Sequence, residues 1–326
     1  MTLPAPYVAR PYRGSADHAA MVGILTAYRR HGGTEQQPTA EQLDVTYANL
    51  TNCDPTTDIV LIETIGGEPV GYARTWWEDL GEDRRDFVML TPIVPAHLDE
   101  ELFSAVLVAL EHHLRPRTVG VTHPRLRAFA PHPGPGLEAA GEAAWLELAG
   151  YRAIRFEAAL VRPNMSDIPE RPLPEGVEVR PVTPGMLRAI FDAHIEAFRG
   201  EWDYHEPTEQ EWQEFIDDPL RDESLWKVAW AGDTIVGQVK SFVNAEENEE
   251  MGHRRGYTEY ISTHAAWRNR GIAGALLAMS LRELAARGMT EAALSADTEN
   301  PGGAFHLYTS LGFELRAYEA IYAKEV

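Results

Sequence analysis

The chain has 326 residues, of which 44% are hydrophobic and 24% charged, and its formal net charge at pH 7 is −21. This length is sufficient for two domains of ordinary size, and the composition is typical of a soluble globular protein. The excess of acidic residues argues against a nucleic acid partner and is compatible with a cationic partner such as an amine. Because there is no long apolar run, no signal-peptide pattern and a single cysteine, Cys53, we expect a cytoplasmic protein without a membrane segment or an internal disulfide.

The first half of the chain predicts an α/β domain over residues 1–161. A short strand ending in Arg10-Pro11 is followed by an amphipathic helix and then by two strands around a tight turn, IVLIETIGGEPVGYARTWW. A further strand, DFVMLTPIV, precedes a helix. The half closes with a helix ending at Gly150-Tyr151 and a last strand, AIRFEAALV.

Residues 162–176, RPNMSDIPERPLPEG, predict a linker because they carry several prolines and no apolar periodicity. After them the same order of elements returns, from a strand ending in Arg180-Pro181 to a helix ending at Gly312-Phe313 and a last strand, LRAYEAIYA. The acidic run at 246–250 is expected to be a solvated loop between two strands. The repeat predicts a second α/β domain over residues 177–326, of the same topology as the first.

A loop rich in small residues separates a strand and a helix of the second half. The strand YTEYIST should end near Thr263, and the helix should run from about Gly271 to Arg287, with Gly288 as a left-handed stop. The loop and helix start contain Arg268, Asn269, Arg270, Gly271, Ile272, Ala273 and Gly274. Unpaired N–H groups at a helix N-terminus bind anions, small residues let the anion approach, and arginines add charge-assisted contacts. The loop therefore predicts an anion site, with a turn surrounded by solvated arginines as the alternative.

The residues that follow this loop identify a family. A strand, EAALSAD, leads to Asn300, and the next helix carries Phe305 and Tyr308. With the loop, this order resembles the GNAT-type acyl-CoA N-acyltransferases over residues 177–326, in an arrangement similar to tandem bacterial members such as mycothiol synthase. The resemblance implies an α/β (α+β) fold of two tandem GNAT-like domains, each a mixed central sheet flanked by helices.

The resemblance implies acetyl-CoA as cofactor and direct transfer of its acetyl group to an amine of a small molecule. The diphosphate would rest on the amides of residues 269–274, with Asn300 and Phe305 as further cofactor contacts. The pantetheine arm would lie along Ile261, Ser262 and Thr263, where a backbone amide could polarise the thioester carbonyl.

Two residues of the second half are predicted to act on protons. Tyr308 stands where the family places the acid that protonates the leaving thiolate, although a core tyrosine is the alternative. Glu259 is the candidate base, on a strand whose alternation puts it on one face with Ile261 and Thr263. Family members commonly carry the glutamate about two residues earlier, at Tyr257, so a water relay to a more distant acid stays open.

The acceptor site and the remaining chemistry have weaker signals. Trp202, Tyr204 and His205 follow the first helix of the second half, where the family builds its acceptor pocket; a loop packing cluster is the alternative. No clustered Cys/His spacing appears, so we expect no metal, and no motif around Cys53 indicates a nucleophile.

The first half lacks the residues of the predicted anion site. Alignment of the two halves puts Leu98, Asp99, Glu100 and Glu101 opposite Arg268, Asn269, Arg270 and Gly271, and Leu146 opposite Tyr308. Three carboxylates would repel a diphosphate. We therefore expect an N-acetyltransferase that is active in its second half only; the alternatives are a non-catalytic acyl-CoA binder or, within the class, a mycothiol-synthase-like enzyme.

Overall fold

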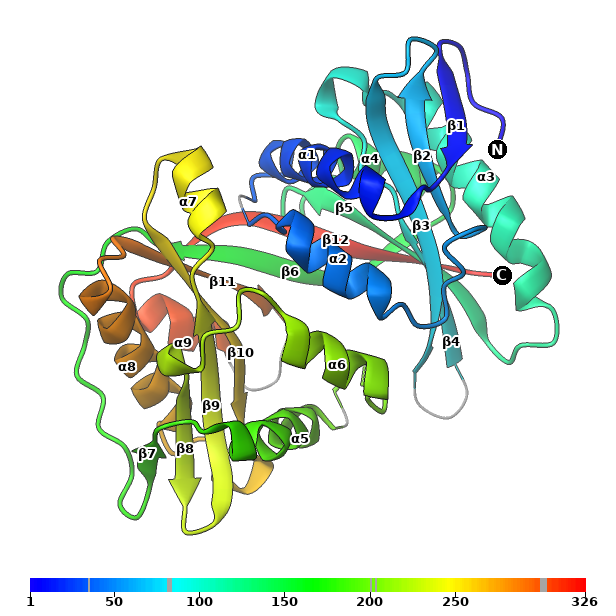
Figure 1. The fold of residues 1–326 in the computed structure, drawn as a ribbon. Coiled ribbons are helices and arrows are strands. Elements are labelled where there is room, and N and C mark those ends of the chain that lie inside the picture. Colours follow the sequence, from blue (N-terminus) through cyan, green and yellow to red (C-terminus); the bar gives the residue numbers. More distant parts are fainter. Residues whose placement is uncertain (35, 81–83, 200, 203, 300–303) are drawn as a thin grey trace. The chain divides into compact units, whose positions relative to one another are not determined.

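The computed structural model describes residues 1–326 except 35, 81–83, 200, 203 and 300–303. The chain forms two compact units (Figure 1). Unit 1 comprises residues 1–157 and 317–326, and unit 2 comprises residues 158–316. Each unit is a mixed β-sheet with helices, as the sequence predicts. No helix in the described part of the chain is long and apolar enough to cross a membrane.

Unit 1 is built on a sheet of strand order β1-β2-β3-β4-β5-β12. Its strands are β1 (Tyr7–Pro11), β2 (Ile59–Thr64), β3 (Pro69–Leu80), β4 (Arg84–Leu90), β5 (Pro124–His132) and the second part of β12 (Glu314–Glu325), and its helices are α1 (His18–His31), α2 (Ala40–Ala48), α3 (Glu100–Thr118) and α4 (Glu142–Leu148). Adjacent side chains of a strand face opposite sides of a sheet. Leu61 accordingly packs with α1 and α2, and Ile62 packs with α3 and α4, so the sheet has a core on each face.

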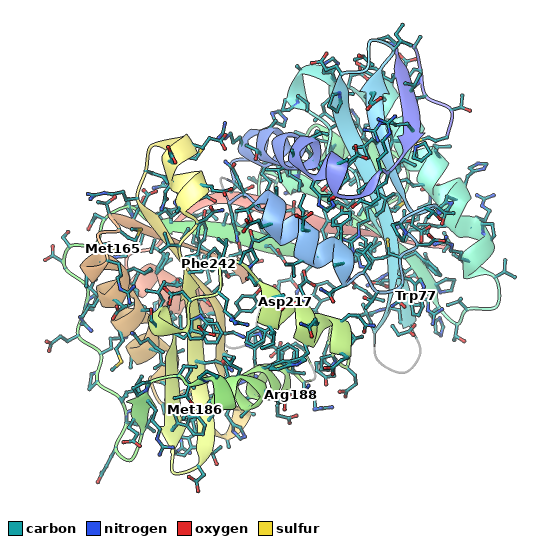
Figure 2. All side chains as sticks on the ribbon, in the orientation of Figure 1. Trp77, Met165, Met186, Arg188, Asp217 and Phe242 are labelled. Carbon is teal, nitrogen blue, oxygen red and sulfur yellow. The ribbon has the colours of Figure 1, made fainter. Side chains whose placement is uncertain are left out.

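Unit 2 repeats this plan with the strand order β6-β11-β10-β9-β8-β7. Its strands are the end of β6 (Arg152–Arg162), β7 (Glu178–Arg180), β8 (Lys227–Ala231), β9 (Thr234–Phe242), β10 (Arg255–Thr263) and β11 (Glu291–Asp297), and its helices are α5 (Leu187–Phe198), α6 (Glu209–Asp217), α7 (Ala245–Met251), α8 (Ile272–Ala286) and α9 (Ala304–Ser310). A Cβ on Gly237 of β9 would lie 2.6 Å from Ile272 of α8, whereas the adjacent Gln238 donates a hydrogen bond to the Ile190 carbonyl of α5 at 3.0 Å. Helices α8 and α5 therefore cover opposite faces of this sheet, and side chains fill the space on both faces (Figure 2).

The last strand of each half of the sequence begins in its own unit and ends in the other. Residues 318–325 of β12 pair antiparallel with β5, and Ala320 and Tyr322 are fully buried in the unit 1 core. Residues 158–162 of β6 belong to unit 2, where β6 lies next to β11. The compact units consequently differ from the predicted ranges 1–161 and 177–326 at both ends, because strand pairing rather than chain order decides where a strand packs.

One predicted loop is a helix. The expectation of a solvated loop at 246–250 is wrong, since these residues lie in α7. The Asn244 side chain accepts a hydrogen bond from the Glu247 amide at 3.1 Å, and Gly252 ends the helix in the left-handed conformation. Glu247 is 2% exposed and accepts a hydrogen bond from the Tyr257 hydroxyl at 2.6 Å, so one residue of the acidic run is part of the interior.

Candidate active site

A cavity of about 650 Å³ lies within unit 2, between the ends of β10 and β11 and the N-terminus of α8. Of the residues predicted for the site, those that line it are Glu259, Ile261, Ser262, Thr263, Arg268, Asn269, Gly271, Ile272, Ala273, Gly274 and Tyr308. The structure therefore gathers most of the predicted cofactor contacts, and both predicted proton-transfer residues, around one hollow.

The cavity exists because two neighbouring strands part. Strands β10 and β11 pair in parallel from Arg255 to Tyr257, but β10 continues to Thr263 and β11 to Asp297. Residues 259–263 line one side of the resulting gap and residues 295–297 the other. Backbone N–H and C=O groups that lose a strand partner in this way can pair with an extended ligand that carries amides.

A bulge in β10 shifts the alternation of side chains along this wall. Glu259 is opposite Lys240, and Ser262 is opposite Gln238. Between these two pairs β10 therefore contains one residue more than β9. The expectation that Glu259 shares a sheet face with Ile261 and Thr263 is therefore wrong, because one extra residue reverses the order of faces beyond it. The Glu259 carboxylate instead accepts a hydrogen bond from the Ser295 amide, across the gap, at 3.0 Å.

The N-terminus of α8 is open at the edge of this cavity. Gly271 precedes the helix with φ +83°, a backbone conformation that residues with a side chain rarely adopt. No side chain caps the helix there. A Cβ at Gly271 would meet no atom within 4 Å, and the first turn carries no acidic residue. Its free N–H groups and the positive end of the helix dipole therefore face the cavity without a competing anion from the helix itself.

The two arginines of this loop have different surroundings. Arg268 lines the cavity, where its guanidinium donates to the Ala197 carbonyl at 2.6 Å and lies 3.5 Å from the Glu201 carboxylate. Arg270 does not line it; its guanidinium lies over the Trp267 ring at 4.6 Å and donates to the Ala266 carbonyl. Of the two, Arg268 is the one that lines the cavity, and a contact from Arg270 to a ligand stays a prediction.

The corresponding helix of unit 1, α3, has its N-terminus occupied by its own side chains. The Asp99 carboxylate accepts a hydrogen bond from the Leu102 amide at 2.8 Å, and Glu100 and Glu101 stand in the first turn. An anion at α3 would compete with one carboxylate for the amides and meet two more in the same turn.

Tyr308 and Glu259 are close enough to influence one another. Tyr308 is 6% exposed, and burial, together with the charge of Glu259, raises the pKa of its phenol. A raised pKa keeps this hydroxyl protonated at neutral pH, which is the state that can donate a proton. The pair thus places a proton donor and a carboxylate on the walls of one cavity.

Comparisons with known proteins show which family the chain belongs to. The sequence profile of the acetyltransferase (GNAT) family matches residues 187–313. A protein named mycothiol acetyltransferase from Streptomyces bingchenggensis is 30% identical over 269 residues, which are 82% of this chain and 81% of that protein. The chain belongs to the GNAT acetyltransferase family.

Solved structures show the same fold over the whole length of this GNAT acetyltransferase. A GCN5-related N-acetyltransferase from Sphaerobacter thermophilus has a TM-score of 0.73 at 24% identity, with 99% of this chain and 97% of that chain covered. A tandem GNAT protein from the clavulanic acid biosynthesis pathway has a TM-score of 0.65 at 14% identity, with 98% of both chains covered. The expectation of a tandem GNAT arrangement and of an acyltransferase is confirmed.

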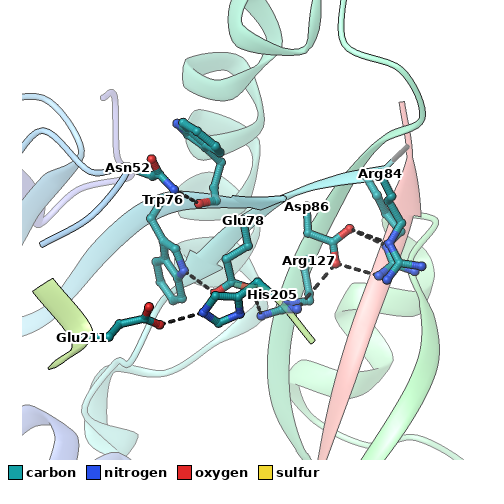
Figure 3. Close-up of polar contacts among 10 residues, drawn as sticks. Asn52, Trp76, Glu78, Arg84, Asp86, Arg127, His205 and Glu211 are labelled. Carbon is teal, nitrogen blue, oxygen red and sulfur yellow. Dashed lines mark hydrogen bonds and ion pairs between the residues drawn. The ribbon is translucent and has the colours of Figure 1, made fainter. Parts of the chain in front are cut away.

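Several residues predicted for the site of this GNAT acetyltransferase do not reach the cavity. Trp202, Tyr204 and His205 do not line it; the Tyr204 ring lies under the Arg199 guanidinium at 5.2 Å, and His205 bonds Glu211 at 2.7 Å (Figure 3). Phe305 does not line it either, although Ala304 and Leu307 of the same helix do. Asn300 lies outside the described residues. The His205–Glu211 contact agrees with the alternative of a loop packing cluster.

The structure adds cavity residues that the sequence did not single out. Helix α5 contributes His194 and Phe198, whose i, i+4 spacing puts them on one helix face. Among the described residues His194 Nδ1 is buried without a hydrogen-bond partner, and burial and the nearby Lys240 cation lower the pKa of its imidazole, which favours the neutral ring. Arg171, from the segment predicted as a linker, also lines the cavity.

Proposed function

We propose that unit 2 transfers the acetyl group of acetyl-CoA directly to an amine of a small molecule, and that unit 1 does not bind the cofactor. The observation that carries this proposal is the contrast between two helix N-termini. That of α8 is uncapped and opens on a cavity, whereas that of α3 is capped by Asp99 and followed by two glutamates. Both helices follow corresponding strands, and only α8 has surroundings that accept a diphosphate.

The cavity offers places for the parts of the cofactor. The amides at the start of α8, from Gly271 to Gly274, would bind the diphosphate. The pantetheine arm carries amides and would pair with β10 between Ile261 and Thr263, where β11 has diverged. A backbone N–H of this stretch would then donate to the thioester carbonyl and stabilise the oxyanion that forms on it.

The reaction needs one base and one acid. An aliphatic ammonium has a pKa near 10 and must lose a proton before its nitrogen attacks the thioester carbon. Glu259 takes this proton, directly or through water. The new C–N bond forms, the C–S bond breaks, and Tyr308 protonates the leaving thiolate to release free CoA.

A second candidate lies within the same chemistry. The curated relatives named mycothiol acetyltransferase align over about four fifths of both chains, and therefore over both units. The name of these relatives suggests an amino-sugar thiol of the mycothiol type as one acceptor to be tested beside simple amines.

The proposal is tested by incubating the full chain with acetyl-CoA and a panel of amines that includes such an amino-sugar thiol. Free CoA should be separated by chromatography, because a thiol-bearing acceptor would react with thiol reagents. We expect CoA release and an acetylated product of matching mass with at least one amine. CoA binding without transfer to any amine of a broad panel would contradict the proposed activity and favour an acyl-CoA-binding protein.

Removal of the Asp99 cap separates the roles of the two units. Asp99→Ala should lower the free energy of unfolding by about 1 kcal/mol, because the Leu102 amide loses its cap, and should leave acetyl transfer unchanged. Chemical denaturation and the CoA-release assay measure the two quantities. A gain of CoA affinity in this variant, or a second CoA bound per chain, with the fold intact, would place a cofactor at α3 of unit 1.

A further inference from the structure

The proline-rich segment between β6 and β7 is fixed against unit 2. Arg282 of α8 donates hydrogen bonds to the carbonyls of Pro169 and Ile168, at 2.8 and 3.4 Å. Arg162, at the end of β6, donates to the Ser166 and Leu311 carbonyls. The backbone of this segment, residues 163–177, is thereby held beside α8 and is not a free linker.

These contacts bring Arg171 to the first turn of α8. A Cβ on Gly274 would lie 3.2 Å from Cδ of Arg171 and 3.2 Å from Leu307, so the aliphatic stem of Arg171 occupies the space that the glycine leaves. The Arg171 guanidinium donates to the Ser310 hydroxyl of α9 at 2.9 Å, and the residue lines the cavity. Because Gly274 has no side chain, the stem of Arg171 can pack against the first turn of α8, and a ligand can still approach the amides there.

Arg171 differs from the other arginine of the cavity, Arg268, in its charged partners. The described arginines that line the cavity are Arg171 and Arg268. Arg268 is bound to α5 through the Ala197 carbonyl and has Glu201 as an ion-pair partner, whereas the described residues give Arg171 no carboxylate partner. An arginine that has no carboxylate partner and lies beside the positive end of a helix is available to pair with an anion that binds there.

The geometry points to Arg171 as a ligand of a phosphate group of the acyl-CoA cofactor, which makes the segment 163–177 part of the cofactor site. This inference rests on the proposed function, since it supposes that the diphosphate or the 3′-phosphate lies at the start of α8. A guanidinium in this position adds charge-assisted hydrogen bonds to those of the helix amides.

Calorimetric titration of the full chain with CoA tests the inference. Arg171→Ala and Arg171→Met should each weaken CoA binding about ten- to a hundredfold, the range expected for the loss of hydrogen bonds to a charged group. Methionine keeps an apolar stem over Gly274, so equal losses in both variants would assign the effect to the charge. Arg316→Ala removes an exposed arginine of unit 2 that pairs with Glu314, and should leave the affinity unchanged.

Dephospho-CoA identifies the phosphate and keeps the outcomes separate. A loss that is the same with CoA and dephospho-CoA would support a contact to the diphosphate, and a loss confined to CoA would support a contact to the 3′-phosphate. Unchanged affinity in both variants, with normal binding by the parent, would overturn the role of Arg171 alone. A parent chain that binds no CoA would overturn the proposed function and this inference with it.

Discussion

Replacement of Gly271 by aspartate should remove measurable CoA binding, whereas asparagine at the same position should retain most of it. Both side chains are among those that best tolerate a positive φ, and a Cβ at this position meets no atom within 4 Å. The two variants therefore carry similar backbone strain and differ in charge. At about 5 Å and an effective dielectric constant of about 20, each pair of like charges costs about 3 kcal/mol, which corresponds to more than a hundredfold in affinity.

Calorimetry on the two variants, with circular dichroism to establish that both are folded, measures this difference. The aspartate variant reproduces in unit 2 the carboxylate that Asp99 supplies at α3 in unit 1. If the aspartate and asparagine variants bound CoA equally well, the diphosphate would not lie at the N-terminus of α8.

Replacement of Tyr308 by phenylalanine should lower kcat by about two to four orders of magnitude, the contribution typical of a general acid, and leave CoA affinity unchanged. The ring remains to pack against Phe313, whose centroid lies 6.2 Å away. Because the pKa of this phenol is raised above its ordinary value, the parent enzyme should not lose the acid on the alkaline side until the pH exceeds about 10.

Tyr257→Phe is the matched control for this variant. Tyr257 is also a buried tyrosine of unit 2, but its hydroxyl donates to Glu247, and it does not line the cavity. Its loss should reduce stability without a comparable change in kcat. Equal rates in the parent and in Tyr308→Phe would remove Tyr308 from the mechanism, and a water molecule would then have to protonate the thiolate.

The parts of the site that could be predicted from the sequence depend on local signals. The helix expected from about Gly271 to Arg287 is α8, Ile272–Ala286, and Gly288 has the predicted left-handed conformation. Glycines stand at both ends because φ is positive at each, a conformation that glycine adopts readily. This requirement depends on a few neighbouring residues only, so a short stretch of sequence predicts it. The acidic α7 had equally local signals, an Asn244 cap and a Gly252 stop, which its charge obscured.

The parts that could not be predicted depend on contacts between distant segments. Nothing near β12 in the sequence indicates that its end pairs with β5, since Tyr318 and His132 are 186 positions apart. The bulge in β10 adds one residue, so the side chains beyond Glu259 lie on the opposite face from the one expected. The alternation of side chains along a regular strand does not predict where a bulge occurs. Arg171 lies at the site because hydrogen bonds such as that from Arg282 to the Pro169 carbonyl hold its segment beside α8. The proline-rich composition of the segment does not predict these hydrogen bonds.

The central claim is that one cofactor binds per chain, with its diphosphate on the first amides of α8. A crystal structure of the chain grown with acetyl-CoA tests this most directly. The account predicts phosphate oxygens within hydrogen-bond distance of the amides from Gly271 to Gly274, and no ligand at α3. A diphosphate bound beside Asp99, or an α8 N-terminus empty at saturating cofactor, would contradict it.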